Sequence, residues 1–211
     1  KEVDTVILAA PVNVIPELAV QVLDRICDDT LVFDVGSTKT LVCEAVRNHP
    51  KRKNFVALHP IAGTEFSGPE AAIYDLFKDK VNIICEQQFS DPAILDKAVK
   101  LFELLKMRNV FMDSPIQHDK HIAYVSHLSH ISSFMLGKTV LEIENDEKNI
   151  FDMAGSGFAS TVRLAKSNPN TWTPILLQNK EYVLKSLEEY IKNLNQFREV
   201  LSKNSEEEVY Q

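Results

Sequence analysis

Three short segments place small or reactive side chains directly after predicted strands. They are Ala10-Pro11-Val12, the DVGSTK segment of residues 34–39 and the HPIAGTE segment of residues 59–65. Glycine lets a ligand approach the backbone, the hydroxyl of Ser37 can hydrogen-bond a substrate, and His59 can act as a base near neutral pH. Because ligands bind at the carboxyl ends of strands in an open α/β sheet, we expect the three segments to form one site. Taken singly, each segment is more readily explained as an ordinary loop with turn-forming residues, in which a backbone group satisfies His59.

Four of the six histidines fall within residues 118–130: His118, His121, His127 and His130. At about 100° per residue along a helix, His127 and His130 share a face, whereas His118 lies roughly opposite His127. A straight helix therefore cannot direct all four rings at one ligand. Either the helix bends or some of these histidines are structural, and His121 is expected on the surface.

A glycine pair further along the chain has only a superficial likeness to a dinucleotide-binding loop. Gly155 and Gly157 flank a serine, but no predicted strand precedes them and Ser160 stands where a third glycine would be needed. We expect a helix break at this point. Arg163 follows, and nothing local distinguishes it from a surface arginine.

Hydrophobic periodicity predicts the elements that must position these residues. Strands are predicted over residues 4–10, 31–35, 55–58, 81–85 and 110–112, and helices over residues 15–26, 39–48 and 93–106. Asn13 is the expected N-cap of the first helix, with Pro16 in its first turn. Strands that alternate with helices predict an α/β sheet that is parallel at least in its first members.

After Asp113 the strand signal ends and the chain is predicted to be helical. Ser114-Pro115 combines an N-cap with proline at the first helical position, for a helix that runs to about residue 144. Thr173-Pro174 repeats this pattern before a helix whose apolar stripe runs from residue 176 to residue 201. That helix would be about 40 Å long, so a partner subunit is expected to cover part of its stripe. The predicted organisation is an α/β half over residues 1–113, an all-α half over 114–203 and a polar tail over 204–211.

Composition excludes several classes of protein. The 211 residues are 45% hydrophobic and 25% charged, as in ordinary globular domains rather than disordered or disulfide-framework chains. A net charge of −7 lacks the basic surface that binds nucleic acids or anionic membranes, and no apolar run approaches the length of about 20 residues that spans a bilayer. The three widely spaced cysteines predict reduced thiols in a cytoplasmic protein.

Together, these segments resemble the prephenate dehydrogenase family. The matching motifs are AAPV at 9–12, DVGSTK at 34–39, HPIAGTEFSG at 59–68, HD…SHLSH at 118–130 and GSGFASTVRLAKSNPNTW at 155–172. The resemblance implies a partial Rossmann-like nucleotide-binding domain followed by a helical dimerisation domain. It also implies that the family's glycine-rich loop and ribose-binding acid belong ahead of the first strand of this chain.

The resemblance implies NAD-dependent oxidative decarboxylation of prephenate, a small molecule, to 4-hydroxyphenylpyruvate in tyrosine biosynthesis, by a homodimer that needs no metal. His59 would take the proton of the ring hydroxyl, and Ser37 would hydrogen-bond the same hydroxyl. Arg163 would hold the ring carboxylate and His130 the side-chain carboxylate. The other residues that the resemblance assigns are Thr64, Glu65, His118 and His127 for the substrate and Ala10, Pro11, Gly36 and Ser37 for the cofactor.

Two departures from the family pattern affect the expected site. Ser129 replaces the proline of the SHLPH motif that many members have, which leaves the helix bend in question. Ser160 stands where many members carry an acidic residue three positions before the arginine. We therefore expect that no ion pair holds Arg163.

Several alternatives remain open from the sequence. Arogenate is an alternative to prephenate and NADP to NAD, and another Rossmann-plus-helical dehydrogenase of hydroxy acids would share the general pattern. The chain could instead be an inactive fragment that only dimerises. A metal-dependent phosphohydrolase is the alternative from a different class, suggested by adjacent His118 and Asp119 with His127 and His130 further along.

Overall fold

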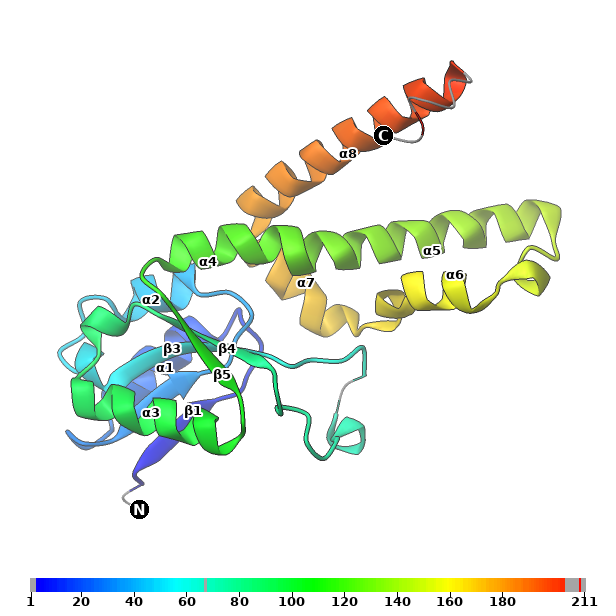
Figure 1. Ribbon diagram of the computed structural model, residues 1–211. Helices are drawn as coiled ribbons and strands as arrows, with labels where there is room; N and C mark the ends of the chain where they lie inside the picture. Colours follow the sequence, from blue (N-terminus) through cyan, green and yellow to red (C-terminus); the bar gives the residue numbers. More distant parts are fainter. Residues whose placement is uncertain (1–2, 67, 204–208, 210–211) are drawn as a thin grey trace.

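The computed structural model describes residues 3–66, 68–203 and 209 and contains one five-stranded sheet (Figure 1). The strands are β1 (Thr5–Leu8), β2 (Leu31–Asp34), β3 (Phe55–Ile61), β4 (Val81–Cys85) and β5 (Arg108–Met112), paired in that order. The first three are parallel, β4 is antiparallel to β3, and β5 is parallel to β4. The expected α/β class and its parallel first strands are confirmed.

Helices cover both faces of this sheet. Helices α1 (Ile15–Leu23) and α2 (Thr40–Val46) pack against one face in a buried cluster that includes Ala19 and Cys43. Helix α3 (Pro92–Leu104) packs against the other face, where Phe102 meets Phe33 edge to face with ring centroids 5.6 Å apart. Each large apolar side chain buried in this way contributes about 1.5–3 kcal/mol, so two layers of core hold the sheet rigid. Cys27, Cys43 and Cys85 are free thiols, as expected.

The start of α1 differs from the prediction. Val14, not Asn13, occupies the N-cap position, and no side chain caps this helix end. Pro16 lies in the first turn as expected, where its missing N–H needs no partner.

Strand β3 is longer than the sequence predicts. It continues through His59 and Pro60 to Ile61, so His59 lies within the strand rather than after it. The reason is long-range pairing: the antiparallel ladder with β4 extends to Ile61, whereas the parallel ladder with β2 ends at Ala57. The end of β3 therefore projects beyond β2, and His59 sits at this step in the sheet.

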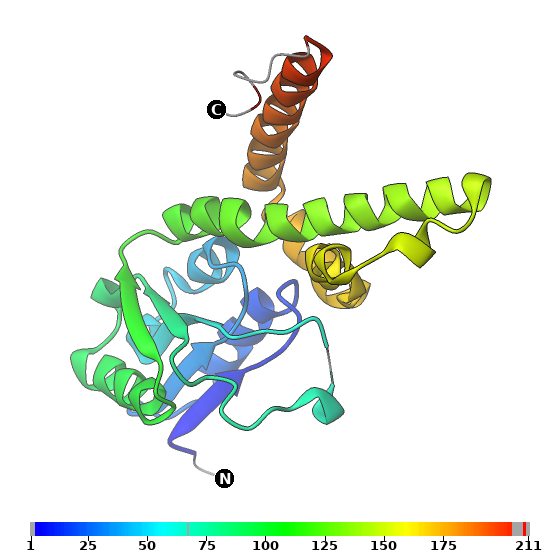
Figure 2. The same ribbon diagram turned by 45° about the vertical axis from the view of Figure 1, so that its right-hand side comes forward.

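The remaining elements are helical (Figures 1 and 2). Helix α4 (Pro115–Ile122), a π-helical turn (Ala123–His127) and α5 (Leu128–Glu147) form one continuous rod. Ser114 caps the rod as predicted, by accepting a hydrogen bond from the Gln117 N–H. Helix α6 (Ser156–Thr161) then returns alongside α5 and leads to α7 (Pro169–Gln178) and α8 (Lys180–Ser202).

The prediction of a single long helix that starts at Thr173-Pro174 is wrong, because the structure has two helices here. Asn168, which accepts a hydrogen bond from the Asn170 N–H, caps α7 ahead of Pro169, and Pro174 lies inside that helix. Helix α7 ends at Gln178, and α8 begins at Lys180 after the junction residue Asn179. The 23 residues of α8 span about 35 Å, and the helix projects away from the rest of the molecule (Figures 1 and 2).

Helix α8 carries an exposed apolar stripe. Ile191, Leu194, Phe197 and Leu201 are 48–52% exposed. Among the described residues, no helix is both long and apolar enough to cross a membrane. Apart from Val209, the predicted polar tail lies outside the described residues.

Candidate active site

Two cavities meet where the carboxyl ends of β1, β2 and β3 face α7. The first encloses about 330 Å³ and is lined by Ala9, Ala10, Pro11, Val12, Val35, Gly36, Ser37, Thr171 and Ile175. The second encloses about 290 Å³ and is lined by residues 59–64 with Val35, Ser37, Ile122, Ser126, His130, Leu164 and Trp172. Ser37 lines both cavities. The three segments singled out in the sequence therefore come together, and side chains of α7 form the opposite wall of both cavities.

A buried ion pair shapes the loop that carries Ser37. The Asp34 carboxylate accepts a hydrogen bond from the Gly36 N–H at 2.9 Å and pairs with the Lys39 ammonium, which also donates to the Leu58 carbonyl at 2.6 Å. A Cβ atom on Gly36 would lie 3.0 Å from both Asp34 Oδ2 and Ile15 Cδ1. Any side chain at this position would force both neighbouring side chains to shift, so glycine fits the tight loop that holds Ser37 at the junction of the cavities.

His59 is joined to two further side chains behind the cavity. Its Nδ1 lies 2.9 Å from Nε2 of His118, and Nδ1 of His118 lies 2.8 Å from Oδ1 of Asp119. The Asp119 carboxylate also accepts hydrogen bonds from the backbone N–H groups of Lys39 and Thr40, each at 2.8 Å, and so caps α2. Burial lowers the pKa of His59 well below its usual value, and the neighbouring His118 and Lys39 lower it further. His59 is therefore neutral at neutral pH.

His130 reaches the cavity through a stack of aromatic rings. Its ring lies against Trp172 of α7 with centroids 3.4 Å apart, and its Nδ1 is 2.9 Å from the Ser126 carbonyl oxygen. His127 lies behind Trp172, fully buried, and its Nδ1 accepts from the Asn179 amide at 3.1 Å. Burial lowers the pKa of His127 to about 4. His118 and His127 thus stand behind the residues that line the cavity, and His121 is exposed.

The π-helical turn explains how His118 and His130 serve one site. A π turn takes in one residue more than an α turn, so later residues lag by about 100°. In an uninterrupted helix His118 and His130 would lie about 120° apart, and the turn brings them close to one line. Ile122 and Ser126 lie between these two histidines in the sequence, four residues apart, and both line the cavity. Ser129 lies within α5, and the helix continues through it. The change in direction of the side chains comes instead from the π-helical turn before α5.

Arg163 has an ionic partner, so the expectation that none would hold it is wrong. The guanidinium pairs with the Glu65 carboxylate, which belongs to the extended segment after β3 rather than to the helix of Arg163. The pKa of Glu65 is lowered. The main cause is a hydrogen bond from the backbone N–H of Glu65 to its own carboxylate, and the contact with Arg163 adds to it, so that together they outweigh partial burial. The Arg163 side chain is 51% exposed, which leaves donors free for an anionic ligand. Thr64, also exposed, lines the second cavity next to Glu65.

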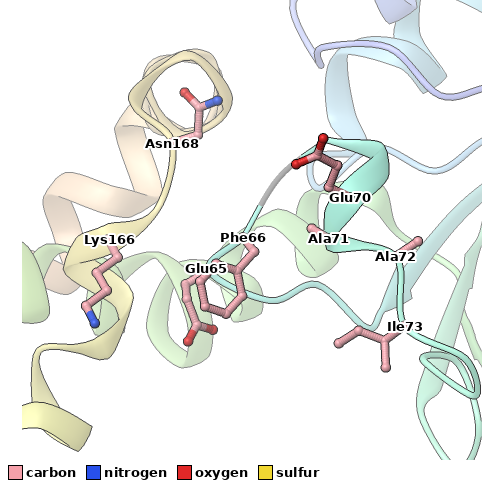
Figure 3. Close-up of a pocket in the computed structure, with 8 residues that line it drawn as sticks. All are labelled: Glu65, Phe66, Glu70, Ala71, Ala72, Ile73, Lys166 and Asn168. Carbon is pink, nitrogen blue, oxygen red and sulfur yellow. The ribbon is translucent and has the colours of Figure 1, made fainter.

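A third cavity, larger than these two, lies elsewhere in the described part of the chain. It encloses about 640 Å³, and Figure 3 shows Glu65 and Phe66 between the segment of Lys166 and Asn168 and the turn that carries Glu70. Its lining contains neither Ser37 nor a histidine, and most of it is exposed loop. Chemistry that needs a base therefore belongs to the smaller cavity with His59.

Several residues that organise the site have no role that the sequence alone indicates. Asp119 and Lys39 support His59 and the Ser37 loop, Trp172 stacks on His130, and Gln178 joins the two halves of the molecule. The Gln178 amide donates to the Val12 carbonyl at 2.8 Å, and its oxygen accepts from the Thr38 hydroxyl at 2.7 Å. The adjacent His118-Asp119 pair was a visible signal, whereas nothing local marks Gln178.

The described part of the chain contains no cluster of three or more His, Cys, Asp or Glu side chains placed to hold a metal ion. His118, the residue that suggested a phosphohydrolase, instead uses both ring nitrogens on His59 and Asp119.

Comparison with known proteins identifies both halves of the chain. The family description "Prephenate dehydrogenase, nucleotide-binding domain" matches residues 1–111, and "Prephenate dehydrogenase, dimerization domain" matches residues 114–211. A prephenate dehydrogenase of Bacillus subtilis is 32% identical over 215 residues, which cover 100% of this chain and 57% of the relative. The chain thus spans less than two thirds of that relative's length.

Solved structures extend the similarity to the backbone. Prephenate dehydrogenase of Aquifex aeolicus, crystallised with hydroxyphenyl propionate and NAD⁺, has a TM-score of 0.87 and 35% identity over 98% of this chain and 72% of its own. Synechocystis arogenate dehydrogenase has a TM-score of 0.76 and 25% identity over 98% and 74% of the two chains. Because the two family descriptions account for both halves and a solved relative at 35% identity covers 98% of the chain, the chain belongs to the prephenate dehydrogenase family.

Proposed function

We propose that the protein containing this chain oxidises prephenate with NAD⁺ and releases CO₂, giving 4-hydroxyphenylpyruvate for tyrosine biosynthesis. The observation that carries the proposal is the position of Ser37, which lines both the small-residue cavity and the cavity of His59. A cofactor in the first and a substrate in the second would meet at Ser37. The names of the Bacillus and Aquifex relatives, and the NAD⁺ bound to the latter, support this choice of substrate and cofactor.

The residues around the first cavity fit a nicotinamide cofactor. Its lining is built mainly from small and aliphatic residues, and Gly36 leaves the backbone open where a Cβ would meet its neighbours. Ala10, Pro11 and Gly36 would border the cofactor. When bound, NAD⁺ supplies the acceptor for the hydride from C4 of the substrate ring.

His59 and Ser37 would act on the ring hydroxyl. Since Nδ1 of His59 is engaged by His118, Nε2 is the ring nitrogen available in the cavity. As the C4–O–H group becomes a carbonyl, its proton passes to Nε2 of neutral His59. The Ser37 hydroxyl would orient the same oxygen, and loss of the ring carboxylate as CO₂ completes the aromatic ring.

Two residues would hold the substrate carboxylates. The Arg163 guanidinium can form two parallel hydrogen bonds with the ring carboxylate, and Glu65 restrains it before substrate binds. His130 is suited to the side-chain carboxylate only when protonated, because its Nδ1 proton already points to the Ser126 carbonyl. Burial, followed by Arg163, lowers the pKa of His130, so we expect its contribution to weaken as the pH rises.

We further propose residues 1–113 as the nucleotide-binding half and residues 114–203 as the half that binds substrate and dimerises. The description of residues 114–211 as a dimerization domain supports a homodimer. The free thiols are compatible with the cytoplasm as the working compartment.

The test is an assay of the full-length protein with prephenate and arogenate, each combined with NAD⁺ and NADP⁺, followed by the absorbance of the reduced nicotinamide. We expect the highest kcat/KM with prephenate and NAD⁺. A preference for arogenate would keep the reaction and change the substrate. Absence of turnover with all four combinations would refute the proposal, and NAD⁺ titration would then show whether the protein binds the cofactor at all.

A further inference from the structure

We propose that His118 and Asp119 form a buried relay that fixes the tautomer of His59 and takes up its positive charge after the substrate proton arrives. This inference rests on the proposed function, in which His59 is the base. His118 is a positioning residue in this scheme, because it acts through His59 and does not line the cavity.

The geometry is a line of two hydrogen bonds. Asp119 Oδ1 to His118 Nδ1 spans 2.8 Å, and His118 Nε2 to His59 Nδ1 spans 2.9 Å. His118 is 1% exposed, Asp119 3% and His59 7%, so water does not compete for these contacts. His118 comes from α4 and His59 from β3, so the relay joins the helical half of the molecule to the sheet.

Hydrogen-bond roles along the line follow from the carboxylate. Asp119 accepts two backbone N–H bonds from the start of α2, which favour its ionised form. Although burial raises the pKa of Asp119, the hydrogen bonds from His118 and Thr40 outweigh burial and lower it. An ionised Asp119 requires the proton of neutral His118 to be on Nδ1, so Nε2 of His118 must accept. His59 therefore carries its proton on Nδ1 and presents an unprotonated Nε2.

Charged groups around the line support one direction of transfer. Burial is the main cause that disfavours positive charge on His59, and His118, Lys39 and His127 disfavour it further. Lys39 is itself paired with the Asp34 carboxylate. Burial lowers the pKa of His118 as well, but the Asp119 carboxylate in direct contact with its ring works against this and favours the charged form. A positive charge is accordingly better accommodated on His118 than on His59.

The proton balance is complete within this unit. The substrate hydroxyl gives its proton to His59 Nε2, and the Nδ1 proton of His59 moves to His118 Nε2. His59 is then neutral in its other tautomer, and His118 is an imidazolium against the Asp119 carboxylate. After product leaves, the Nε2 proton of His59 is lost to water in the cavity and Nδ1 recovers its proton from His118.

The first test observes the histidine rings directly. Ring ¹⁵N NMR of the full-length protein with labelled histidine reports which nitrogen of each neutral ring is protonated, and the His59→Asn variant assigns the His59 signals. We expect His59 to be protonated at Nδ1 and His118 at Nδ1. A His59 ring protonated at Nε2 in the free protein would overturn the relay, whether or not the protein turns over prephenate.

The second test separates the relay from mere packing. In His118→Gln the amide oxygen can accept the Nδ1 proton of His59 but cannot take up a proton, whereas His118→Phe removes the acceptor. We expect kcat to fall about 10–10²-fold in the Gln variant and further in the Phe variant, with KM changed less than about twofold. The His59 tautomer should persist in the Gln variant and be lost in the Phe variant.

His121→Gln is the matched control, because His121 is an exposed histidine on the same helix. It should leave kcat, KM and the His59 signals unchanged. Equal kcat in the unmodified protein and the His118→Gln variant would refute the relay while leaving the proposed function intact. Absence of activity in the unmodified protein would refute the proposed function, and the tautomer measurement would still decide the hydrogen-bond roles.

Discussion

His59 is 7% exposed, and its burial, together with the neighbouring His118 and Lys39, opposes a positive charge on its ring. An unperturbed histidine titrates near pH 6.5, and burial moves this one well below that value. A base must be unprotonated to act, so with His59 as the proposed base we expect activity to rise with pH as His59 loses its proton and to be level above that point. We therefore expect the rising part of the profile to lie on the acid side of pH 6.5 and the titration of His59 to leave activity constant across the neutral range.

We expect His59→Asn to lower kcat about 10²–10⁴-fold, because asparagine keeps a hydrogen bond but cannot accept the proton. NAD⁺ binding to the full-length protein should be nearly unchanged, since His59 does not line the nucleotide cavity. Steady-state kinetics from about pH 4.5 to about pH 9, a range that brackets the ordinary histidine value, would also show the acidic limb disappear. A near-normal kcat with the same limb would mean that another group is the base.

Arg163 should contribute to substrate affinity rather than to the proton transfer. Its side chain is half exposed and already pairs with Glu65, so Arg163→Ala should raise KM roughly tenfold to a hundredfold, or about 1.5–3 kcal/mol. Arg163→Lys should recover little, because an ammonium cannot reproduce the planar fork. The control is Arg108→Ala, an exposed arginine on β5. An unchanged KM in the Arg163→Ala variant would contradict the assignment.

At the scale of elements, α7 is the part that joins the nucleotide side to the substrate side. It places Thr171 and Ile175 against the first cavity and Trp172 against the second. At its end, Gln178 bridges the Val12 carbonyl and the Thr38 hydroxyl. One side chain thus ties two loops of the sheet to the helical half.

Loss of this bridge should loosen the cofactor site. We expect Gln178→Ala to raise the KM for NAD⁺ several-fold and to lower the free energy of unfolding by about 1–3 kcal/mol, because two partly buried hydrogen bonds are lost. Urea unfolding and cofactor kinetics would measure the two effects. Gln21→Ala, an exposed glutamine on α1, is the matched control, and equal effects in both variants would argue against a bridge.

Local signals in the sequence predict an element when its own residues determine it. Ser114-Pro115 starts a helix because cap and proline act within one turn, and β2 is recognisable as a short apolar run. The extent of β3 depends on pairing with β4, which lies far along the chain, so His59 could not be placed within a strand from its neighbours. Similarly, Asn168-Pro169 and Thr173-Pro174 are equivalent start signals, and local sequence does not rank them.

The same distinction applies to the candidate site. The convergence of the Ser37 and His59 segments follows from sheet topology and was predictable. The His59–His118 contact joins residues 59 positions apart, and the Arg163–Glu65 pair joins residues 98 apart. Such contacts depend on how the rod of α4 and α5 lies over the sheet, which no local pattern encodes.

For the whole molecule, the apolar stripe of α8 predicts association with a second copy. Four large side chains, each about half exposed on a projecting helix, would each gain roughly 0.7–1.5 kcal/mol on full burial, about half the value for a fully exposed side chain. Light scattering at micromolar concentration should therefore give the mass of a dimer. The double variant Leu194→Asp, Phe197→Asp should shift the mass to a monomer, whereas Gln196→Asp, on the opposite side of α8, should not. A monomeric unmodified protein would contradict this expectation.

Acid should destabilise the folded protein through its buried histidines. His59, His118 and His127 have lowered pKa values, and burial is the main cause in each case. The unfolded chain takes up protons near pH 6.5, whereas the folded protein does so only at lower pH. Stability is therefore fully present above pH 6.5 and is lost as the pH falls toward about 4, the pKa of His127.

Urea unfolding at a series of pH values would measure this loss, at up to about 1.4 kcal/mol per pH unit for each histidine. His127→Phe should flatten the dependence relative to the exposed control His121→Phe. Parallel curves for these two variants would exclude His127 as a contributor.

The π-helical turn over Ala123–His127 makes the length of the rod as important as its composition. Deleting one residue there would restore an unbroken α-helix, yet it would rotate every later residue by about 100° around the axis. His130 would leave the cavity, and the side of α5 that meets the segment after α6 would turn away from it. A substitution in this stretch changes the contacts of one side chain, whereas a one-residue change in length changes the orientation of every side chain of α5. We therefore expect the rod to tolerate substitutions far better than insertions or deletions.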